Sequence, residues 1–216
     1  MHLEAVIFDM DGTLFDSATV IPEAYIAAVL AGGGREWAPE DIISAYSLGP
    51  PAVMLTHLLG RRSSALDLKR YYSELAMRAR ALAPYRGIET VLRELRQRLP
   101  IAVFSGASRE ACRILLEGAG LSQYFETVVG GDEVPDPKPD PAGIVLACAR
   151  LGVPPSAAAY VGDAPADIEA ARRSEAMAVA AGWGHQFSPQ VPADLVLQRP
   201  ENILSLAPAK PGQNRP

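Results

Sequence analysis

Two carboxylates spaced two residues apart follow an apolar run near the start of the chain. In "AVIFDMDGTLFDS" (5–17), Asp9 and Asp11 come after four apolar residues, and Gly12 and Thr13 follow at once. Ionised groups are costly to bury unless they are paired or bound to a cation, so a core strand has no need of them. An EF-hand calcium loop is disfavoured, because its glycine stands later in the loop. The pattern therefore indicates a chemical site at the end of a strand.

Polar residues of complementary chemistry stand where three later strands are expected to end. In chain order they are Ser105 with Gly106, Lys138 in "DPKPDP", and Asp163 with Asp167. Mg²⁺ prefers oxygen ligands and is usually held by one or two carboxylates, with water and phosphate oxygens completing its shell. A carboxylate can also act as a nucleophile and form an aspartyl-phosphate. Together these residue types predict phosphoryl transfer assisted by Mg²⁺.

Each residue has an expected role in that chemistry. Asp9 is the expected nucleophile, and it binds Mg²⁺ together with Asp163 and the backbone carbonyl of Asp11. The carboxyl group of Asp11 is expected to give a proton to the leaving oxygen and to take one from the attacking water. The Lys138 ammonium and the Ser105 hydroxyl are expected to bind the remaining phosphate oxygens.

Three glycine and threonine positions and Asp167 have expected roles beside these residues. The backbone N–H groups of Gly12 and Thr13 are expected to be free near the same place and to form a nest for an anion. Gly106 is expected to contact the substrate beside Ser105. Asp167 allows two interpretations, because it is either part of the metal site or a first-turn acid that the helix dipole favours.

Apolar strands alternate with helical segments over most of the chain. This alternation predicts right-handed crossovers and a doubly wound α/β fold with a parallel, Rossmann-like sheet. In such sheets the functional groups gather at the carboxyl ends of the strands. One helix is expected to have Asp140 as its N-cap and Pro141 as its first residue, and to end at Gly152. The strands are expected at 3–8, 101–104, 127–130, 157–162, 177–181 and 194–197.

Residues 18–83 indicate a helical insertion after the first strand. They are rich in alanine and leucine and interrupted at glycines, which fits three or four short helices, the last near 64–83. Arg61 and Arg62 in this insertion could reach a substrate carboxylate, although paired arginines in a loop are more often solvated. The predicted organisation is an α/β core of 1–17 and 84–207, the helical insertion of 18–83, and a disordered tail of 208–216.

Composition narrows the classes of partner. The formal net charge is −5 and no long basic run occurs, which disfavours nucleic-acid binding. The first residues lack the basic segment of a signal peptide, and no apolar stretch is long enough for a membrane span, so a cytoplasmic protein with no membrane partner is expected. Cys112 and Cys148 lie in apolar helical patterns, which favours core packing over a disulfide. The expected partner is a small phosphorylated metabolite, and the chain is expected to be a monomer or a homodimer.

Taken as a set, these residues resemble the four motifs of the haloacid dehalogenase-like phosphohydrolase superfamily. The resemblance covers residues 3–205, and the motifs appear in the family's order. They are "DMDGTL" (9–14), Ser105, Lys138 in "KPDP", and "GDAPAD" (162–167). The first motif alone is a specific signature of the superfamily, and the four motifs together are a much more specific one.

The resemblance implies a mechanism and a helical cap. It implies a nucleophile at Asp9, an acid and base at Asp11, and Mg²⁺ on Asp9, on the carbonyl of Asp11 and on Asp163. Asp167 would support either the metal site or Lys138. The inserted residues 18–83 would form a mobile helical cap, whose loop at Gly49 faces the active site.

Four segments point to one branch of the superfamily, the phosphoglycolate phosphatases and their pyrophosphatase relatives. They are "LFDS" (14–17), "PYRGIETVLREL" (84–95), "AGWGH" (181–185) and "PADLVL" (192–197). The alternatives are a phosphomutase of the β-phosphoglucomutase type, a pyrophosphatase, a phosphonatase, or a non-catalytic metabolite-binding relative. One departure from the family is Ser174-Glu175, where most relatives have Ala-Gly. Glu175 must therefore either adopt a left-handed backbone or end its helix in another way.

Overall fold

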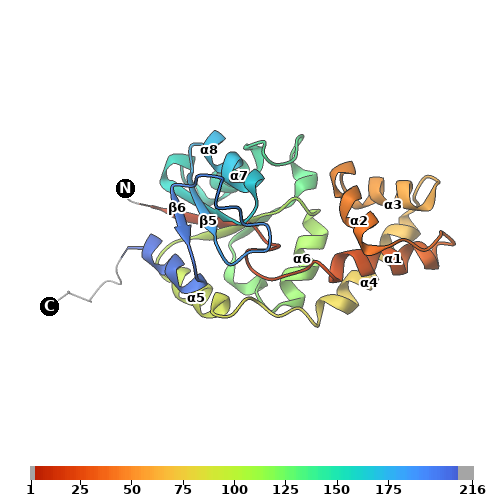
Figure 1. The fold of residues 1–216 in the computed structure, drawn as a ribbon. Helices are drawn as coiled ribbons and strands as arrows, with labels where there is room; N and C mark the ends of the chain where they lie inside the picture. The colour runs from red at the N-terminus through yellow and green to blue at the C-terminus, as the bar shows by residue number, and fades with distance from the viewer. Residues whose placement is uncertain (1–2, 209–216) are drawn as a thin grey trace.

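A computed structural model describes residues 3–208, which form a six-stranded sheet flanked by helices (Figure 1). All neighbouring strands run parallel, in the order β3-β2-β1-β4-β5-β6. The strands are β1 (Ala5–Phe8), β2 (Ile101–Phe104), β3 (Thr127–Val129), β4 (Ala158–Gly162), β5 (Met177–Ala181) and β6 (Leu195–Leu197). The doubly wound α/β fold predicted from the sequence is confirmed. Residues 209–216 of the predicted tail lie outside the described residues.

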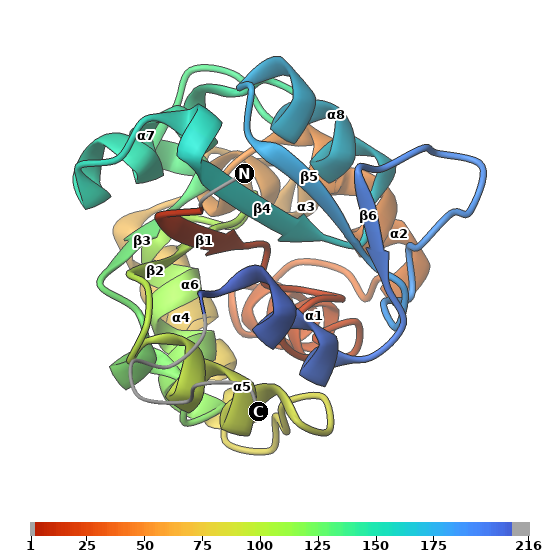
Figure 2. The ribbon, with the colours of Figure 1, turned by 90° about the vertical axis from the view of Figure 1, so that its left-hand side faces the viewer.

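Helices cover both faces of the sheet, because successive residues of a buried strand point to opposite sides. In β1, Val6 and Phe8 belong to one hydrophobic cluster, Ala5 and Ile7 belong to the other, and all four are buried. Figure 2 shows α7 and α8 on one side of the sheet and α5 on the other. The first cluster includes α5 (Ile88–Leu95), α6 (Arg109–Gly118) and the 3₁₀-helix η5 (Pro200–Leu206), and the second includes α7 (Ala142–Leu151) and α8 (Pro165–Arg173). Shorter 3₁₀-helices are η2 (Ser122–Tyr124), η3 (Gly131–Glu133) and η4 (Pro155–Ala157).

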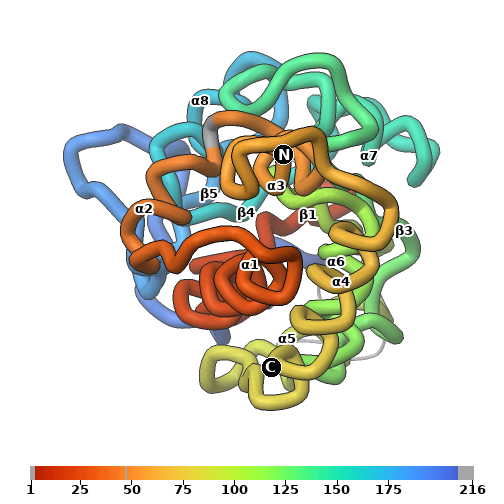
Figure 3. Tube along the Cα trace, turned by 90° about the vertical axis from the view of Figure 1, so that its right-hand side faces the viewer, coloured from red at the N-terminus to blue at the C-terminus, as the bar shows by residue number. Residues whose placement is uncertain are grey.

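The chain between β1 and α5 forms a separate group of helices, called here the helical unit (residues 20–79). Figure 1 shows the helical unit to one side of the sheet, and Figure 3 shows it from the opposite end to Figure 2. Its last helix ends earlier than the predicted boundary at 83. Its elements are α1 (Val20–Ala31), α2 (Pro39–Ser44), the 3₁₀-helix η1 (Ala45–Leu48), α3 (Pro51–Leu59) and α4 (Ala65–Ala79).

Helix α4 joins the helical unit to the rest of the chain by packing against α6. Gly118 of α6 lies so close to α4 that a Cβ atom there would overlap the Ala79 carbonyl group. Glycine is therefore required at this position for the two helices to approach. At the start of α6, the hydroxyl groups of Tyr72 and Ser108 lie 3.2 Å apart. This contact holds the helical unit next to the carboxyl ends of the strands.

The start of α7 differs in detail from what the sequence predicted, whereas its end does not. The N-cap of α7 is Pro141 and not Asp140, so the helix begins at Ala142. The Asp140 carboxylate still accepts a hydrogen bond from the Ala142 N–H at 2.9 Å, because an aspartate can bond the backbone two residues on. Gly152 ends α7 in the left-handed conformation, as predicted.

Glu175 takes the first of its two expected options, with a left-handed backbone (φ 67°). The Glu175 N–H donates to the Arg172 carbonyl at 3.1 Å, and the Ala176 N–H donates to the Ala171 carbonyl at 3.0 Å. This is the Schellman pattern of hydrogen bonds, which requires the left-handed residue after the helix. A residue with a Cβ atom costs about 1 kcal/mol more than glycine in this conformation.

Asp67 organises the start of α4. Its carboxylate accepts hydrogen bonds from the N–H and the hydroxyl of Ser64, at 2.9 and 2.7 Å, and from two nitrogens of Arg61, at 2.8 and 3.1 Å. Arg70 makes a further contact at 3.3 Å. The Arg61 and Ser64 donors hold the pKa of Asp67 well below its usual range. Arg61 is thus held by Asp67 within the helical unit.

Asp67→Asn should lower the free energy of unfolding at neutral pH by about 1–2 kcal/mol, because it removes the charge that these donors stabilise. A carboxyl group with a depressed pKa adds stability above its unfolded pKa of about 3.9, and this stability is lost as the pH falls. Urea unfolding of parent and variant at neutral pH and near pH 3.5 would check this. The difference should shrink in acid, and a difference that grows in acid would contradict the expected role.

Cys112 and Cys148 are both buried and free, which confirms core packing over a disulfide.

Among the helices of residues 3–208, none combines the length and the apolar character that crossing a bilayer requires.

Candidate active site

Two adjacent strands, β1 and β4, bring acidic residues to one edge of the sheet. β1 lies between β2 and β4, and Phe8 pairs with Val103 on one side and with Val161 on the other. Asp9 follows β1 and donates its backbone N–H to the Val161 carbonyl at 2.8 Å. Asp163 is the residue after β4. The carboxyl ends of parallel strands therefore place the two side chains together, as the sheet topology predicts.

Lys138 links two buried carboxylates at this edge. Its Nζ atom lies 2.5 Å from Oδ1 of Asp9 and 2.7 Å from Oδ1 of Asp167. Oδ1 of Asp167 also accepts a hydrogen bond from the Tyr160 hydroxyl at 3.3 Å, and its Oδ2 accepts one from the Ala164 N–H at 3.0 Å. Because both oxygens of Asp167 have protein donors, this residue is well placed to hold Lys138 against Asp9.

Burial and neighbouring charges shift the pKa values of these groups. Burial raises the pKa of Asp9 well above its usual range, and the Lys138 ammonium lowers it only in part. Burial also disfavours the charge of Lys138, but Asp167 and Asp9 outweigh that effect and raise its pKa. Asp163 is a third buried carboxyl group beside this pair of ion pairs, with an oxygen within 4.8 Å of oxygens of Asp9 and Asp167, so the site holds three carboxyl groups and one ammonium group.

Asp163 lies between two glycines, in a space that no other side chain could share. A Cβ atom at Gly12 or at Gly184 would overlap the Asp163 side chain. Oδ2 of Asp163 accepts a hydrogen bond from the Gln186 N–H at 2.9 Å, whereas Oδ1 is buried and has no partner among the described residues. Burial raises the pKa of Asp163 to about 6. A buried carboxylate oxygen without a partner calls for a bound cation or water.

A cavity of about 430 Å³ opens from these residues toward the helical unit. Its volume is in the range of sites for small molecules. The lining includes most of the residues singled out in the sequence, which are Asp9, Asp11, Gly49, Ser105, Gly106, Lys138, Asp163 and Asp167. The structure thus brings together residues that lie far apart in the sequence, and it adds Gly49 from the helical unit.

The family model of the haloacid dehalogenase-like hydrolases matches residues 3–175 of the chain. The chain belongs to this family. The phosphoglycolate phosphatase of Aquifex aeolicus (strain VF5) is 31% identical over 209 residues, which cover 94% of this chain and 96% of that protein. The phosphoglycolate phosphatase of Chromobacterium violaceum is also 31% identical, over 95% of this chain and 96% of its own. The superfamily and the phosphoglycolate phosphatase-like branch inferred from the sequence are confirmed, and the chain is a phosphatase of this family.

Solved structures bear out the fold. The structure of CbbY from Rhodobacter sphaeroides in complex with phosphate matches with a TM-score of 0.78. The match covers 95% of this chain and 99% of that one, at 20% identity. At that identity the likeness concerns the fold alone.

Asp11 of this phosphatase is turned away from the three clustered carboxylates. Its Oδ1 accepts hydrogen bonds from the N–H and the hydroxyl of Ser17, at 2.7 and 2.6 Å. Its Oδ2 lies 3.9 Å from Nε2 of His185. The side chain therefore lines the cavity without joining the group formed by Asp9, Asp163 and Asp167, in which one oxygen of each lies within 4.8 Å of the others. The predicted use of the Asp11 backbone carbonyl as a ligand stays a prediction.

The expectation that Gly12 and Thr13 offer free N–H groups is wrong. The Gly12 N–H donates to the Phe15 carbonyl at 2.9 Å, and the Thr13 N–H lies 3.4 Å from the Met10 carbonyl. These bonds close the turn after β1, so neither N–H remains for an anion. Gly12 serves instead as the space into which Asp163 fits, and its left-handed backbone (φ 76°) also favours glycine. Substrate binding by these two residues stays a prediction from the sequence.

Several residues that shape the site were not found from the sequence. Ser17 holds Asp11, Tyr160 bonds Asp167, and Gln186 bonds Asp163 through its backbone. Ser17 lies within the "LFDS" segment, so a search for a hydroxyl near Asp11 could have found it. Nothing in the sequence marks Gln186, because its role depends on its N–H and on the path of the loop after β5.

Gly12→Ala should reduce kcat/KM by about 100-fold, because displacing a reacting group by about 1 Å has an effect of that size. The new Cβ atom must push the Asp163 carboxylate out of its place. Gly120→Ala is the matched control, since Gly120 has a similar backbone (φ 69°) and a Cβ atom there would have no neighbour within 4 Å. Steady-state rates of both variants would test this. Equal loss of activity in the two would contradict the steric explanation.

Proposed function

We propose that this phosphatase uses Mg²⁺ to hydrolyse a small phosphorylated metabolite, passing the phosphoryl group first to Asp9 and then to water. The observation that carries the proposal is the cluster of Asp9, Asp163 and Asp167 at one end of the cavity, with Lys138 paired to Asp9 and Asp167. A lone ion pair would need one carboxylate, whereas this cluster has three. The surplus charge and the unpartnered Asp163 oxygen support a site for a divalent cation.

The donor set fits Mg²⁺ in particular. All candidate ligands are carboxylate or carbonyl oxygens, and Mg²⁺ is held by such hard ligands together with water and phosphate oxygens. Asp9, Asp163 and the backbone carbonyl of Asp11 are the proposed ligands, with Asp167 supporting the site by holding Lys138. When bound, Mg²⁺ supplies positive charge that offsets the charge of the carboxylates and of the phosphate.

The protein residues then have distinct tasks in the reaction. An oxygen of Asp9 forms a bond to phosphorus while the bond to the leaving oxygen breaks. Asp11 gives its proton to that leaving oxygen, and it later takes a proton from the water that attacks the phosphorylated Asp9. The hydrogen bonds from Ser17 fix the orientation of the Asp11 carboxyl group during both steps.

Lys138 and Ser105 bind the transferred phosphoryl group. The Lys138 ammonium lies against Asp9 and is held by Asp167, so it needs little rearrangement to meet the charge of the transition state. Ser105 is nearly buried and lines the cavity directly after β2. A Cβ atom at Gly106 beside it would have no neighbour within 4 Å, which leaves space for the substrate.

Residues 18–83 are the proposed cap over this site. The helical unit supplies part of the cavity lining, including Gly49 between η1 and α3. A leaving group would therefore lie between the sheet edge and the helical unit. A cytoplasmic location and a monomeric or dimeric state stay predictions from the sequence.

The proposal is tested by measuring inorganic phosphate released from a panel of phosphate monoesters by the purified protein. Mg²⁺ should be required, removal of the metal with EDTA should stop release, and added Mg²⁺ should restore it. Because several relatives are phosphoglycolate phosphatases, phosphoglycolate belongs in the panel. The absence of release from every ester with Mg²⁺ present, or equal release in EDTA, would refute the proposal.

A further inference from the structure

The two ends of the cavity differ in chemistry. The end at the sheet holds the carboxylates and Lys138, whereas the end at the helical unit is aromatic and apolar. Tyr25 and Tyr71 stack there with ring centroids 4.1 Å apart, and Tyr46 and Met54 line the same end. Burial raises the pKa of Tyr25 and of Tyr46 well above that of an exposed phenol, so both hydroxyl groups are neutral in ordinary buffers.

The described lining of the cavity offers no second positively charged side chain that could pair with a second anion. Among the described residues, Lys138 is the one lysine or arginine in the lining, and it is held between Asp9 and Asp167. His185 stands near Asp11, at the charged end.

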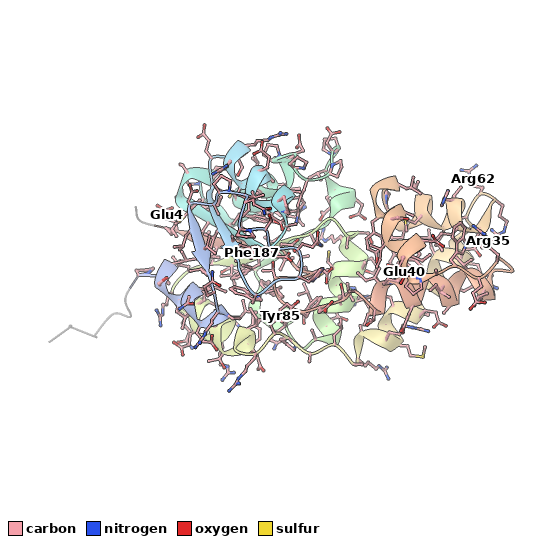
Figure 4. All side chains as sticks on the ribbon, in the orientation of Figure 1. Glu4, Arg35, Glu40, Arg62, Tyr85 and Phe187 are labelled. Carbon is pink, nitrogen blue, oxygen red and sulfur yellow. The ribbon has the colours of Figure 1, made fainter. Side chains whose placement is uncertain are left out.

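Three arginines of the helical unit lie away from the cavity lining. Arg61 is paired with Asp67, and the guanidinium of Arg35 stacks over Trp37 at 3.8 Å. Figure 4 shows Arg35 and Arg62 at the end of the helical unit that is farthest from the sheet. A leaving group in the cavity would therefore meet tyrosine rings, phenol hydroxyls and a methionine, with no positive charge among them.

We infer that the substrate is the phosphate monoester of an uncharged alcohol with an apolar face, and that leaving groups carrying a carboxylate or a second phosphate are rejected. The inference rests on the proposed function, because it assumes that the phosphoryl group lies at Asp9. A second anion against the tyrosines would lose its water and meet neutral phenol donors but no cation, so its charge would stay uncompensated, which is unfavourable. It would also be repelled by Asp11, which lines the same cavity.

The size of the cavity agrees with a leaving group larger than two carbons. The cavity volume of about 430 Å³ lies within the range of sites that bind small molecules. A phosphoryl group fills only part of that space. A ring of sugar or aryl size fits in the rest, with its face on the tyrosines and any hydroxyl groups near the phenols.

Two matched substrate pairs test the inference on the unmodified protein with Mg²⁺. The first pair is 2-hydroxyethyl phosphate and phosphoglycolate, which differ in having a hydroxyl or a carboxylate at the far end. The second is benzyl phosphate and 4-carboxybenzyl phosphate. In each pair kcat/KM should be at least about tenfold higher for the neutral member, and benzyl phosphate should exceed 2-hydroxyethyl phosphate.

A cation placed at the apolar end should reverse the preference. Tyr46 is 39% exposed, so Tyr46→Arg can be accommodated, and Tyr46→Gln is the uncharged control. In Tyr46→Arg the ratio of kcat/KM for the carboxylate member to that for the neutral member should rise about tenfold, with no such rise in Tyr46→Gln.

The outcomes separate this inference from the proposed function. Phosphate release with carboxylate members equal to or better than their neutral partners would overturn the inference and leave the proposed function in place. An unchanged ratio in a folded Tyr46→Arg variant would also overturn it. No release from any of the four esters would overturn the inference, and the proposed function falls as well only when the wider panel of esters also gives no phosphate.

Discussion

Asp9→Asn should abolish phosphate release, with kcat lowered by roughly 10⁴-fold or more, because an amide cannot act as the nucleophile. The side chains have the same shape, and the amide oxygen can still accept the hydrogen bond from Lys138. The protein should therefore stay folded, and the loss should appear in kcat. Single-turnover and steady-state rates would measure it.

Asp136→Asn serves as the control for Asp9→Asn. Asp136 lies in the same loop as Lys138 but is exposed, so the same chemical change should leave the rate unaffected. Should Asp9→Asn retain more than a small fraction of the parental rate, Asp9 could not be the nucleophile. The cluster around Lys138 would then need another explanation.

Lys138→Met should reduce both stability and activity. The ammonium group is the partner of two buried carboxylates, and removing one member of a buried ion pair typically costs about 3–5 kcal/mol, which is the loss expected here. Methionine fills similar space, so the effect comes mainly from the lost charge. Without that charge, Asp9 and Asp167 face each other across the site, and a phosphate dianion meets them unscreened.

The pH dependence of Lys138→Met identifies the cause of its instability. Burial raises the pKa of Asp9, so this carboxyl group becomes neutral as the pH falls, and the difference in unfolding free energy between parent and variant should shrink in acid. Lys69→Met, at an exposed position on α4, should show no such loss. A Lys138→Met protein as stable as the parent at neutral pH would show that the ion pairs contribute nothing.

The positions of the strands follow from features that are local in the sequence, whereas their order in the sheet was not predicted. A buried parallel strand needs a short apolar run, and segments such as "IAVF" are buried on both faces. Asp9 and Asp163 could be placed together without coordinates, because adjacent parallel strands end at the same edge of a sheet. Strand boundaries differed from prediction by one or two residues, since an end is decided by the last hydrogen bond in the ladder.

The details of the site depend on the paths of loops, which the sequence does not disclose. Gly12 and Thr13 were expected to bind an anion, but the turn after β1 takes up both N–H groups. The partnership of Asp11 with Ser17 depends on the same turn. Gln186 reaches Asp163 by a backbone group that any residue would have. The backbone of Glu175 could be predicted as one of two options, because a Schellman helix end requires a left-handed residue at this position whatever its side chain.

The most direct measurement is peptide mapping by mass spectrometry after the protein is mixed with substrate and Mg²⁺ and quenched in acid. Asp11→Asn is the protein to use, with 4-nitrophenyl phosphate as substrate, because its leaving group needs no proton from Asp11, so only hydrolysis is slowed and the phosphorylated enzyme should accumulate. One phosphoryl group should be found on the peptide containing Asp9, and it should be absent from Asp9→Asn. A phosphoryl group on another residue, or phosphate release by Asp11→Asn with none ever bound to the protein, would contradict transfer through Asp9.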